Sequence, residues 1–320
     1  MYTFLHRRFT QNLRLFHLPQ PNTSILLALS SGKDSLCMLQ LFLDLYKNYN
    51  HILSLGIIYI DHQTRHDSIG NTEHLVNVLR GLHINSYIYQ VSPKNYSENE
   101  LRKLRYQLFI KTAETYSYKI IATAHTSSDR METMLYNIMN GNHIDSLNSL
   151  GWIRYVNNKI HIIRPLLNFN KHETNWLCKY YSLPVWFDYT NLYLNYSRSR
   201  IRYEIIPYIK QYYSVNAEKQ ISKFLDFSSH DIEYIRQNTV KMYTMLIHPK
   251  YVALNYRRLL NQHTTIQIRV LQLFFIHNTN MRLSYEHVET VLQQLRSNKQ
   301  IHAPLTFSKL YNNQSWIYLV

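Results

Sequence analysis

The stretch ILLALSSGKDSLCMLQLF, residues 25–42, decides which fold this chain adopts. Its apolar run Ile25–Leu29 has the length of a buried strand, and apolar residues return at helical spacing from Leu36 onward. Between them, Ser30–Ser35 forms a turn of small polar residues that presents backbone N–H groups at a helix N-terminus. This strand, loop and helix are typical of a phosphate-binding site.

The segments that follow this unit alternate between strand and helix patterns. Strands are predicted at Ile52–Ile60, Ser86–Val91 and Lys119–Ala124, and helices at Ser35–Lys47, Asn71–Leu82 and Ser97–Ser117. The alternation predicts an α/β fold, a Rossmann-like parallel sheet covered by helices on both faces, whose ligands bind at the carboxyl ends of the strands. Three polar segments are therefore expected at one edge of the sheet: Ser30–Ser35, Ile60–His62 and Ala124–His125.

The pattern is looser after Gly151 and mainly helical after residue 210. A strand is predicted at Ile160–Leu166, then a helix at Lys171–Tyr181 and a polar loop, Asp188–Arg202, that enters another helix. Further helices are predicted at Ala217–Leu246, Ile266–His277 and Ser284–Leu295, before a hairpin of Ile301–Phe307 and Trp316–Val320 around a turn at Asn312–Asn313. We place the domain boundary near residue 210, which gives domains 1–210 and 211–320.

Composition favours a polyanionic partner. Among 320 residues, 35 Lys and Arg stand against 20 Asp and Glu, a formal net charge of +15. Nucleic acid is favoured over an acidic membrane face, because no apolar run approaches the roughly 20 residues of a spanning helix. The two cysteines, Cys37 and Cys178, exclude a disulfide framework and a CxxC zinc site. Met1–Pro19 has the basic amphipathic pattern of a transit peptide, but the first strand follows at once.

The loop Ser30–Ser35 is not a Walker motif, because Leu27 stands where that motif needs glycine and Asp34 where it needs Ser or Thr. One alternative needs no ligand: Ser31 as a helix N-cap with Asp34 at the third helical position. The phosphate interpretation uses Gly32 for close backbone approach and the neighbouring serines as hydroxyl donors. A carboxylate repels bare phosphate, so Asp34 then needs a bridging Mg²⁺.

The whole loop resembles the SGGxDS pyrophosphate loop, or PP-loop, of the N-type ATP pyrophosphatases, which use ATP to adenylate an oxygen and release pyrophosphate. Further segments are similar to those of the tRNA(Ile)-lysidine synthase family. In chain order these are Tyr59–Arg65 (VDHxLR), Leu101–Tyr106 (ARxxRY), Ala122–Thr133 (ATAHHxDDxxET), Arg164–Leu167 (RPLL) and Asp188–Pro207 (DxSNxxxxYxRNxIRxxxxP). The matches run in register from about residue 20 to 210.

The resemblance implies a ligase that forms a C–N bond in two steps. ATP adenylates the base oxygen of the wobble cytidine in a CAU-anticodon tRNA(Ile), and free L-lysine then displaces AMP, so that the product, lysidine, reads AUA. Domain 1–210 would bind ATP and do the chemistry, and 211–320 would bind tRNA. The implied ATP-binding residues are Ser30, Ser31, Gly32, Lys33, Asp34 and Ser35, the catalytic ones Asp34, Arg105, His125, Asp129 and Glu132, and the tRNA-binding ones Arg198, Arg200 and Arg202.

The resemblance also implies individual roles. Asp34 and Asp129 would hold Mg²⁺ across the phosphates, Arg105 and His125 would contact phosphate or developing charge, and Glu132 would orient the lysine ammonium or accept its proton. Some of these residues also have a structural alternative. Arg105 could be an exposed helix arginine, His125 a structural histidine and Asp129 a helix cap. The arginines of the predicted tRNA-binding set could be a solvated helix start. Aromatic and basic residues beyond residue 210 fit RNA contact and fit an ordinary helix surface equally well. They are Tyr212, Tyr213, Lys219, Lys223, Arg257 and Arg258.

Two departures from the family pattern bear on activity. Ser31 stands where the family has glycine, which costs on the order of 1 kcal/mol if that position needs a positive φ. The segment His125–Asp129 also lacks one histidine and the first aspartate of its motif. The alternatives are a catalytically weakened tRNA-binding homologue, a PP-loop tRNA thiolase, which two isolated cysteines argue against, and an amidating synthetase, which leaves the arginines at 198–202 unexplained.

The amino-acid usage also bears on origin. Tyrosine is frequent (28) and glycine rare (6), which is typical of an AT-rich genome. We therefore expect a plastid-encoded protein of the chloroplast stroma, with the bacterial cytoplasm as the alternative.

Overall fold

The computed structural model describes residues 2–49, 53–63, 68–92, 96–186, 197–281, 283–297 and 310–319. The chain divides into two units, Met1–Asp226 and Phe227–Val320. The division falls later than residue 210 because the start of helix α10 (Ala217–Leu246) is bonded to the first unit: Arg130 Nη1 donates to the Ser222 carbonyl at 3.2 Å. The roles assigned to the two domains stay predictions.

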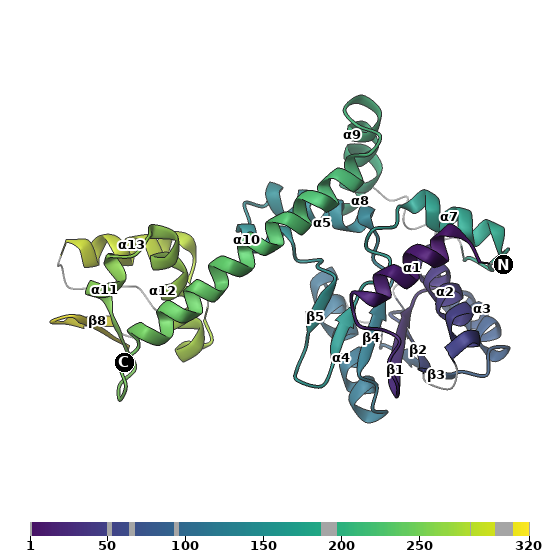
Figure 1. Ribbon diagram of the computed structural model, residues 1–320, viewed down its shortest axis with the longest axis horizontal. Helices are drawn as coiled ribbons and strands as arrows, with labels where there is room; N and C mark the ends of the chain where they lie inside the picture. Colours follow the sequence, from purple (N-terminus) through teal and green to yellow (C-terminus); the bar gives the residue numbers. More distant parts are fainter. Residues whose placement is uncertain are drawn as a thin grey trace. The chain divides into compact units, whose positions relative to one another are not determined.

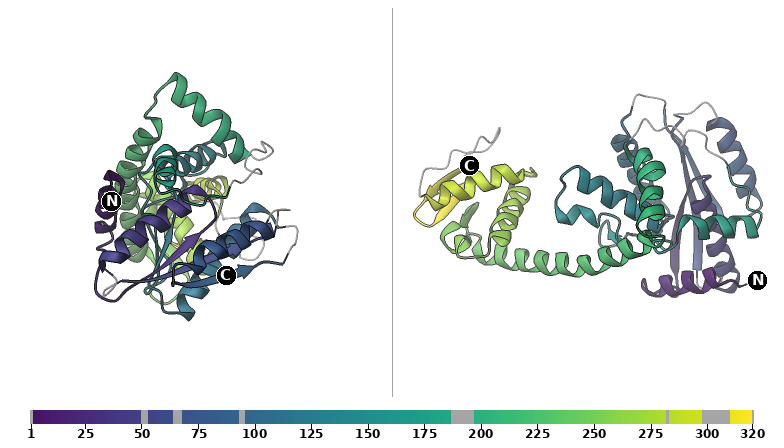
Figure 2. Two further views of the ribbon diagram at one scale, coloured as in Figure 1. Left: turned by 90° about the vertical axis from the view of Figure 1, so that its right-hand side faces the viewer. Right: turned by 90° about the horizontal axis from the view of Figure 1, so that it is seen from above.

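The first unit is built on a six-stranded sheet in the order β3-β2-β1-β4-β6-β5 (Figures 1 and 2). Its strands are β1 (Thr23–Leu29), β2 (Leu53–Asp61), β3 (Asn85–Gln90), β4 (Ile120–Thr123), β5 (Ile153–Tyr155) and β6 (His161–Ile163). All neighbours pair in parallel except β5 and β6. The predicted parallel α/β sheet is confirmed, and β5 is an addition that the sequence pattern did not predict.

The helices of the first unit separate the strands as predicted, with ends that differ by a few residues. They are α1 (Phe4–Arg14), α2 (Lys33–Tyr49), α3 (Ser68–Arg80), α4 (Glu98–Thr115), α5 (Ser127–Met139), α6 (Ile144–Leu147), α7 (Lys171–Tyr180), α8 (Ser197–Arg200), the π-helix η2 (Ile201–Ile205) and α9 (Ile206–Tyr212). The amphipathic N-terminal segment is therefore a structural helix, α1, that packs into the core with Leu5, Phe9 and Leu13.

Both faces of the sheet are covered, because successive side chains of a strand point to opposite faces. From β1, Ile25, Leu27 and Leu29 join one hydrophobic cluster with residues of α1, α2, α3 and α7. Leu26 and Ala28 join a second cluster on the other face, against α4. The two layers leave the carboxyl ends of the strands as the edge at which a ligand is expected.

The second unit packs helices against a three-stranded antiparallel sheet in the order β7-β9-β8. Besides the end of α10, its elements are β7 (Ala253–Asn255), α11 (Tyr256–Leu260), α12 (Thr264–Thr279), α13 (Tyr285–Arg296), β8 (Leu310–Asn313) and β9 (Trp316–Leu319). Its core gathers residues of every one of these elements, among them Leu254, Leu271, Val288, Leu310 and Ile317. The predicted helical region is confirmed, as is the closing strand predicted at Trp316–Val320, which is the second strand of a β hairpin.

The position of the hairpin turn corrects the sequence prediction. Asn312 and Asn313 are the last residues of β8 and pair with Ile317 and Trp316. The turn lies after them, and Gln314 has a φ of 51° there. Asparagine is common in turns, but here its backbone completes the ladder. The first predicted hairpin strand, Ile301–Phe307, falls outside the described residues.

No helix among the described residues combines the length and the apolar character needed to cross a bilayer.

Candidate functional site

Hydrogen bonds between its own residues stabilise the loop Ser30–Ser35 after β1. Ser30 Oγ and Ser35 Oγ are 2.8 Å apart, and the Gly32 N–H donates to Ser30 Oγ at 3.4 Å. Because α2 begins at Lys33, the backbone N–H groups of the loop lie at a helix N-terminus, where they favour binding of an anion. Ser31 is not among the residues with positive φ, so the strain expected for a serine at this position is absent.

The three polar segments that follow β1, β2 and β4 meet at one edge of the sheet, as expected from the parallel pairing of β1 with β2 and β4. Asp61 and His62 line a cavity of about 230 Å³ with Ser30, Ser31 and Arg105. Thr72 Oγ1 donates to Asp61 Oδ2 at 3.1 Å, which fixes that carboxylate against α3. The loop therefore has a polar cavity on its β2 side.

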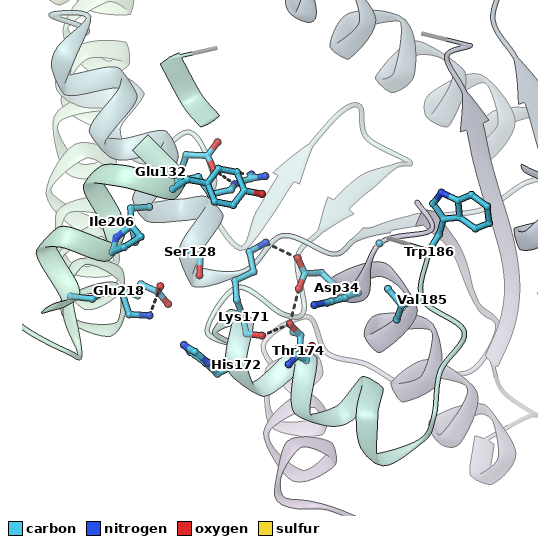
Figure 3. Close-up of a pocket in the computed structure, with 17 residues that line it drawn as sticks. Asp34, Ser128, Glu132, Lys171, His172, Thr174, Val185, Trp186, Ile206 and Glu218 are labelled. Atoms are coloured by element: carbon cyan, nitrogen blue, oxygen red, sulfur yellow. Dashed lines mark hydrogen bonds and ion pairs between the residues drawn. The ribbon is translucent and has the colours of Figure 1, made fainter. Parts of the chain in front are cut away.

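Two larger cavities lie at the β4 side of the same loop. One, of about 440 Å³, is bounded by the loop, the end of β4 and residues of α4 that include Arg102 and Arg105. The other, of about 650 Å³, is bounded by α2, α5, α7, η2, α9 and the start of α10 (Figure 3). The residues that line both are Gly32, Asp34, Lys171, Trp186 and Arg202.

Lys171 joins the two carboxylates that the sequence assigns to a metal ion. Its Nζ donates to Asp34 Oδ2 at 2.6 Å, and Thr174 Oγ1 donates to Asp34 Oδ1 at 2.7 Å (Figure 3). The same Nζ donates to Asp129 Oδ1 at 3.0 Å. Burial alone lowers the pKa of Lys171, but Asp129 and Asp34 raise it above its usual value, so the ammonium stays charged. Both oxygens of Asp34 accept from α7, so the capping role considered for it is not realised.

Asp129 performs two tasks at once. Its Oδ2 accepts from the N–H and the hydroxyl of Thr126, each at 2.9 Å, and so closes the N-terminus of α5. Its Oδ1 faces Lys171 and lies 3.6 Å from Arg202 Nη2. Burial alone raises the pKa of Asp129, but Lys171 and the Thr126 N–H hold it well below the usual range. Oδ2 therefore has the helix-cap role, and Oδ1 faces the cavity.

Glu132 and Arg202 form an ion pair on the wall of the larger cavity. Arg202 Nε and Nη2 lie 2.8 and 2.7 Å from Glu132 Oε2, and the Glu132 side chain is only 8% exposed. Burial raises the pKa of Glu132 and Arg202 opposes that rise. Glu132 is therefore a better proton acceptor than an exposed carboxylate.

The other predicted arginines lie in different surroundings. Arg198 stacks on the ring of Tyr136, 4.8 Å from its centroid, and Arg200 is largely exposed and pairs with Glu204 at 3.0 Å. Only Arg202 of the three faces the cavities. Asp188, Asn191 and Tyr196 of the same motif, and Arg65 of an earlier one, lie outside the described residues.

His125 is a neutral group at the edge of the smaller cavity. Its Nδ1 lies 3.0 Å from Thr123 Oγ1. Burial, and after it the charge of Arg164, lowers the pKa of His125 to about 3. A neutral imidazole offers one N–H donor. The positive charge of this cavity comes from Arg102 and Arg105 on its α4 side, together with Lys171 and Arg202.

A single divalent cation fits between Asp34 and Asp129, because both carboxylates already share one ammonium. In the described part of the chain no group of three or more His, Cys, Asp and Glu is arranged around one ion. Mg²⁺ keeps an octahedral shell and is often held by two carboxylates together with phosphate oxygens and waters. The residues thus fit Mg²⁺ bound jointly with a nucleotide.

Sequence reasoning missed Lys171 and Thr174. Lys171 and Thr174 occupy the first turn of α7, which Asn170 caps by accepting from the Glu173 N–H at 2.9 Å. The signal available was the RPLL match just before this helix, which brings its N-terminus to the sheet edge. A lone lysine at a helix start has no pattern that distinguishes it from a surface lysine.

Residues 4–209 match the family model of the PP-loop domain. A thiolase structure, the U34-tRNA thiolase NcsA from Methanococcus maripaludis with its 4Fe-4S cluster, aligns with a TM-score of 0.59 at 18% identity over 69% of this chain and 76% of that chain. At that identity the likeness concerns the fold alone. Fold and loop together define an ATP-binding protein of the PP-loop class.

Relatives of similar length narrow the class. The chloroplastic tRNA(Ile)-lysidine synthase of Gracilaria tenuistipitata var. liui is 39% identical over 318 residues, 99% of each chain. That of Pyropia yezoensis is 32% identical over 99% of this chain and 96% of the relative. The tRNA(Ile)-lysidine synthase of a Nostoc species is 36% identical over 76% of this chain and 70% of the relative. The chain belongs to the tRNA(Ile)-lysidine synthase family.

Proposed function

We propose that this chain joins L-lysine to the wobble cytidine of a CAU-anticodon tRNA(Ile) in two ATP-dependent steps. Lysidine formation on tRNA(Ile) by a C–N-bond-forming ligase is the activity of the family. The finer mechanism is supported by one observation: two cavities, both with PP-loop residues in their walls, share Asp34, Lys171 and Arg202. A nucleotide in one cavity and an amine in the other would meet at these residues.

ATP is assigned to the smaller cavity. The N–H groups and hydroxyls of Ser30–Ser35 would hold the phosphates, with Arg105 as a further cation and neutral His125 as an N–H donor. Asp34 and Asp129 would hold Mg²⁺, which supplies charge neutralisation as pyrophosphate leaves. In the first step the cytosine O2 attacks the α-phosphorus, and the bond from that phosphorus to pyrophosphate breaks.

Lysine is assigned to the larger cavity, where Glu132 is the nearly buried acceptor. In the second step the ε-amine attacks the cytosine C2, and the bond from C2 to the adenylated oxygen breaks, so that AMP leaves with that oxygen. The attacking nitrogen loses a proton. Glu132, whose pKa burial raises, is the group we assign to accept it.

The tRNA is assigned to the basic surface of the chain. Arg198 and Arg200 are the contacts that we retain from the predicted set, because Arg202 lines both cavities and pairs there with the nearly buried Glu132, whereas Arg198 and Arg200 line neither. The tyrosines and basic residues beyond residue 210 remain candidates for base stacking and phosphate contact. The chloroplastic relatives agree with the predicted location in a plastid.

Two alternatives are less well supported. A thiolase needs accessible thiolates, whereas Cys37 and Cys178 are both buried, and burial raises the pKa of Cys178 to about 11. A tRNA-binding homologue without activity is disfavoured because Asp34 lines both cavities, Asp129 the smaller one and Glu132 the larger one. Lysine-dependent AMP release with the cognate tRNA separates the latter alternative from the ligase.

The test is mass analysis of the anticodon nucleoside after incubation with ATP, L-lysine and tRNA(Ile). The wild-type chain should form lysidine, and Asp34→Ala should form none. Asp44→Ala is the matched control, because Asp44 lies on the same helix but pairs with His6 and Lys47. Product from the Asp34 variant would show that the metal assignment is wrong, and tRNA binding without product from the wild-type chain would favour the inactive homologue.

A further inference from the structure

The side chain of Lys171 occupies the place between Asp34 and Asp129 that the proposed function gives to a divalent cation. One ammonium cannot be accommodated together with a metal ion on the same pair of oxygens. The two cations must therefore exclude each other at this position, and the outcome depends on what else the site contains.

The remaining oxygens of the two carboxylates are already engaged. Asp34 Oδ1 accepts from Thr174, and Asp129 Oδ2 accepts from the N–H and hydroxyl of Thr126. Asp34 Oδ2 and Asp129 Oδ1 both accept from Lys171. A metal ion that enters the unliganded site consequently has to take its protein ligands from this lysine.

The backbone of Lys171 is held by the start of α7. Asn170 and Glu173 bond reciprocally, side chain to backbone, at 2.9 and 3.0 Å, and Glu173 also accepts from Arg8 of α1 at 2.7 Å. Only the flexible side chain of Lys171 can turn away, and turning away leaves the two carboxylates without their shared partner.

The net charge of the site determines when a metal ion can replace the Lys171 ammonium. Asp34, Asp129 and Glu132 face the cations Lys171 and Arg202, so the cluster carries one net negative charge. A bare divalent ion would overcompensate this charge and displace a bonded ammonium into solvent. ATP brings phosphate oxygens that can accept from the displaced Lys171 and can coordinate the metal at the same time.

We propose that Lys171 is a built-in placeholder that keeps divalent metal out of the Asp34–Asp129 site until a nucleotide arrives. The inference rests on the proposed function for the metal ligands alone. It predicts that the chain binds metal only together with ATP, and that removing the ammonium creates a metal site in the nucleotide-free protein.

The test uses Mn²⁺, a spectroscopically visible substitute for Mg²⁺, titrated into the full chain and followed by the electron paramagnetic resonance of free Mn²⁺. We expect little binding to the wild-type chain at low millimolar Mn²⁺, and binding once a non-hydrolysable ATP analogue is added. Lys171→Met should bind Mn²⁺ without nucleotide at least about tenfold more tightly than the wild-type chain, because the cluster then carries two unbalanced negative charges.

Two variants act as controls. Lys210→Met removes a lysine from the wall of the same cavity, but Lys210 pairs with Glu218, so its Mn²⁺ binding should match the wild type. Asp34→Asn placed on Lys171→Met should abolish the gain. If Lys171→Met fails to fold, as judged by circular dichroism, Lys171→Gln replaces it.

Equal Mn²⁺ affinity of the wild-type and Lys171 variants, or tight Mn²⁺ binding by the nucleotide-free wild-type chain, would overturn the placeholder role. The titration contains neither tRNA nor L-lysine. A chain that makes no lysidine but gains a Mn²⁺ site on loss of Lys171 would therefore contradict only the proposed function.

Discussion

Arg202 and Arg200 lie two residues apart in the chain and hold carboxylates of very different burial. Glu132, the partner of Arg202, is 8% exposed, whereas Glu204, the partner of Arg200, is 43% exposed. Removing one partner of a buried pair leaves a charge that water cannot reach, whereas an exposed pair is screened.

Arg202→Met should therefore lower the free energy of unfolding by about 1–3 kcal/mol and abolish lysidine formation. Arg200→Met is the matched control and should change the free energy of unfolding by less than about 0.5 kcal/mol. Urea denaturation measures both. Equal destabilisation by the two substitutions would show that the Glu132 pair contributes no more than a surface pair.

His125 gives a prediction about pH. Its pKa in the folded chain is about 3, whereas in the unfolded chain it takes the ordinary value of roughly 6.5. Between these values the unfolded chain binds a proton that the folded chain does not. The contribution of His125 to stability is thus fully present above about pH 6.5 and is lost as pH falls toward 3, by at most about 1.4 kcal/mol per pH unit.

The measurement is urea denaturation of the wild type and His125→Gln at several pH values from 7.5 to 5. The wild type should lose more stability than the variant over this range. Two curves that stay parallel would show that His125 takes up its proton with equal ease in the folded state.

At the scale of elements, the N-terminal helix α1 is a part of the core. Phe9 is buried and meets Phe42 of α2 edge to face, with ring centroids 4.9 Å apart. Asn12 donates to the Pro165 carbonyl at 2.7 Å, beside the segment that leads into α7. The helix that carries Lys171 thus depends on α1 for its position.

Phe9→Ala should cost about 3–5 kcal/mol of stability, because it leaves a cavity between α1 and α2. Phe4→Ala, on the same helix but with a side chain that is largely exposed, should cost far less. Thermal unfolding followed by circular dichroism compares the two variants. Similar midpoints for both would mean that α1 contributes little to the fold.

At the scale of the whole molecule, the excess of 15 positive charges makes a prediction about salt. Neutralising phosphates releases counterions, so the affinity for tRNA should fall by at least about tenfold between 50 and 200 mM KCl. The affinity for an ATP analogue should fall much less, because we assign the nucleotide to a cavity whose loop offers hydrogen-bond donors. Filter binding with labelled tRNA and equilibrium dialysis with the analogue measure the two, and equal salt dependence would argue against an extended RNA surface.

Much of the fold is predictable because β1, β2 and β4 are rich in apolar residues and helices alternate with the strands. The four strands β1 to β4 lie at the predicted segments. The three-residue strand β5 was missed because Arg154 and Tyr155 are exposed and give no burial pattern. Strand β8 was not predicted, because asparagine in isolation signals a turn and Asn312 and Asn313 were therefore assigned to the turn.

Site residues were predictable where a family motif contains a side chain with a clear chemical role. Asp34, Asp129 and Glu132 were named from the sequence, and the structure brings them to the walls of the shared cavities. Lys171 was not named, because its role comes from a contact across 137 residues of chain with Asp34. The contact between Lys171 and Asp34 forms only because α7 packs on α2, and no local sequence pattern predicts that packing.

The two-sided carboxylate of Asp129 connects the interior of the cavities to the backbone of α5. A ligand that binds beside Asp129 Oδ1 will change the strength of the hydrogen bond that Oδ2 accepts from the Thr126 N–H. Hydrogen–deuterium exchange at that amide should consequently report when a ligand enters or leaves the two cavities, even a ligand that carries no chromophore.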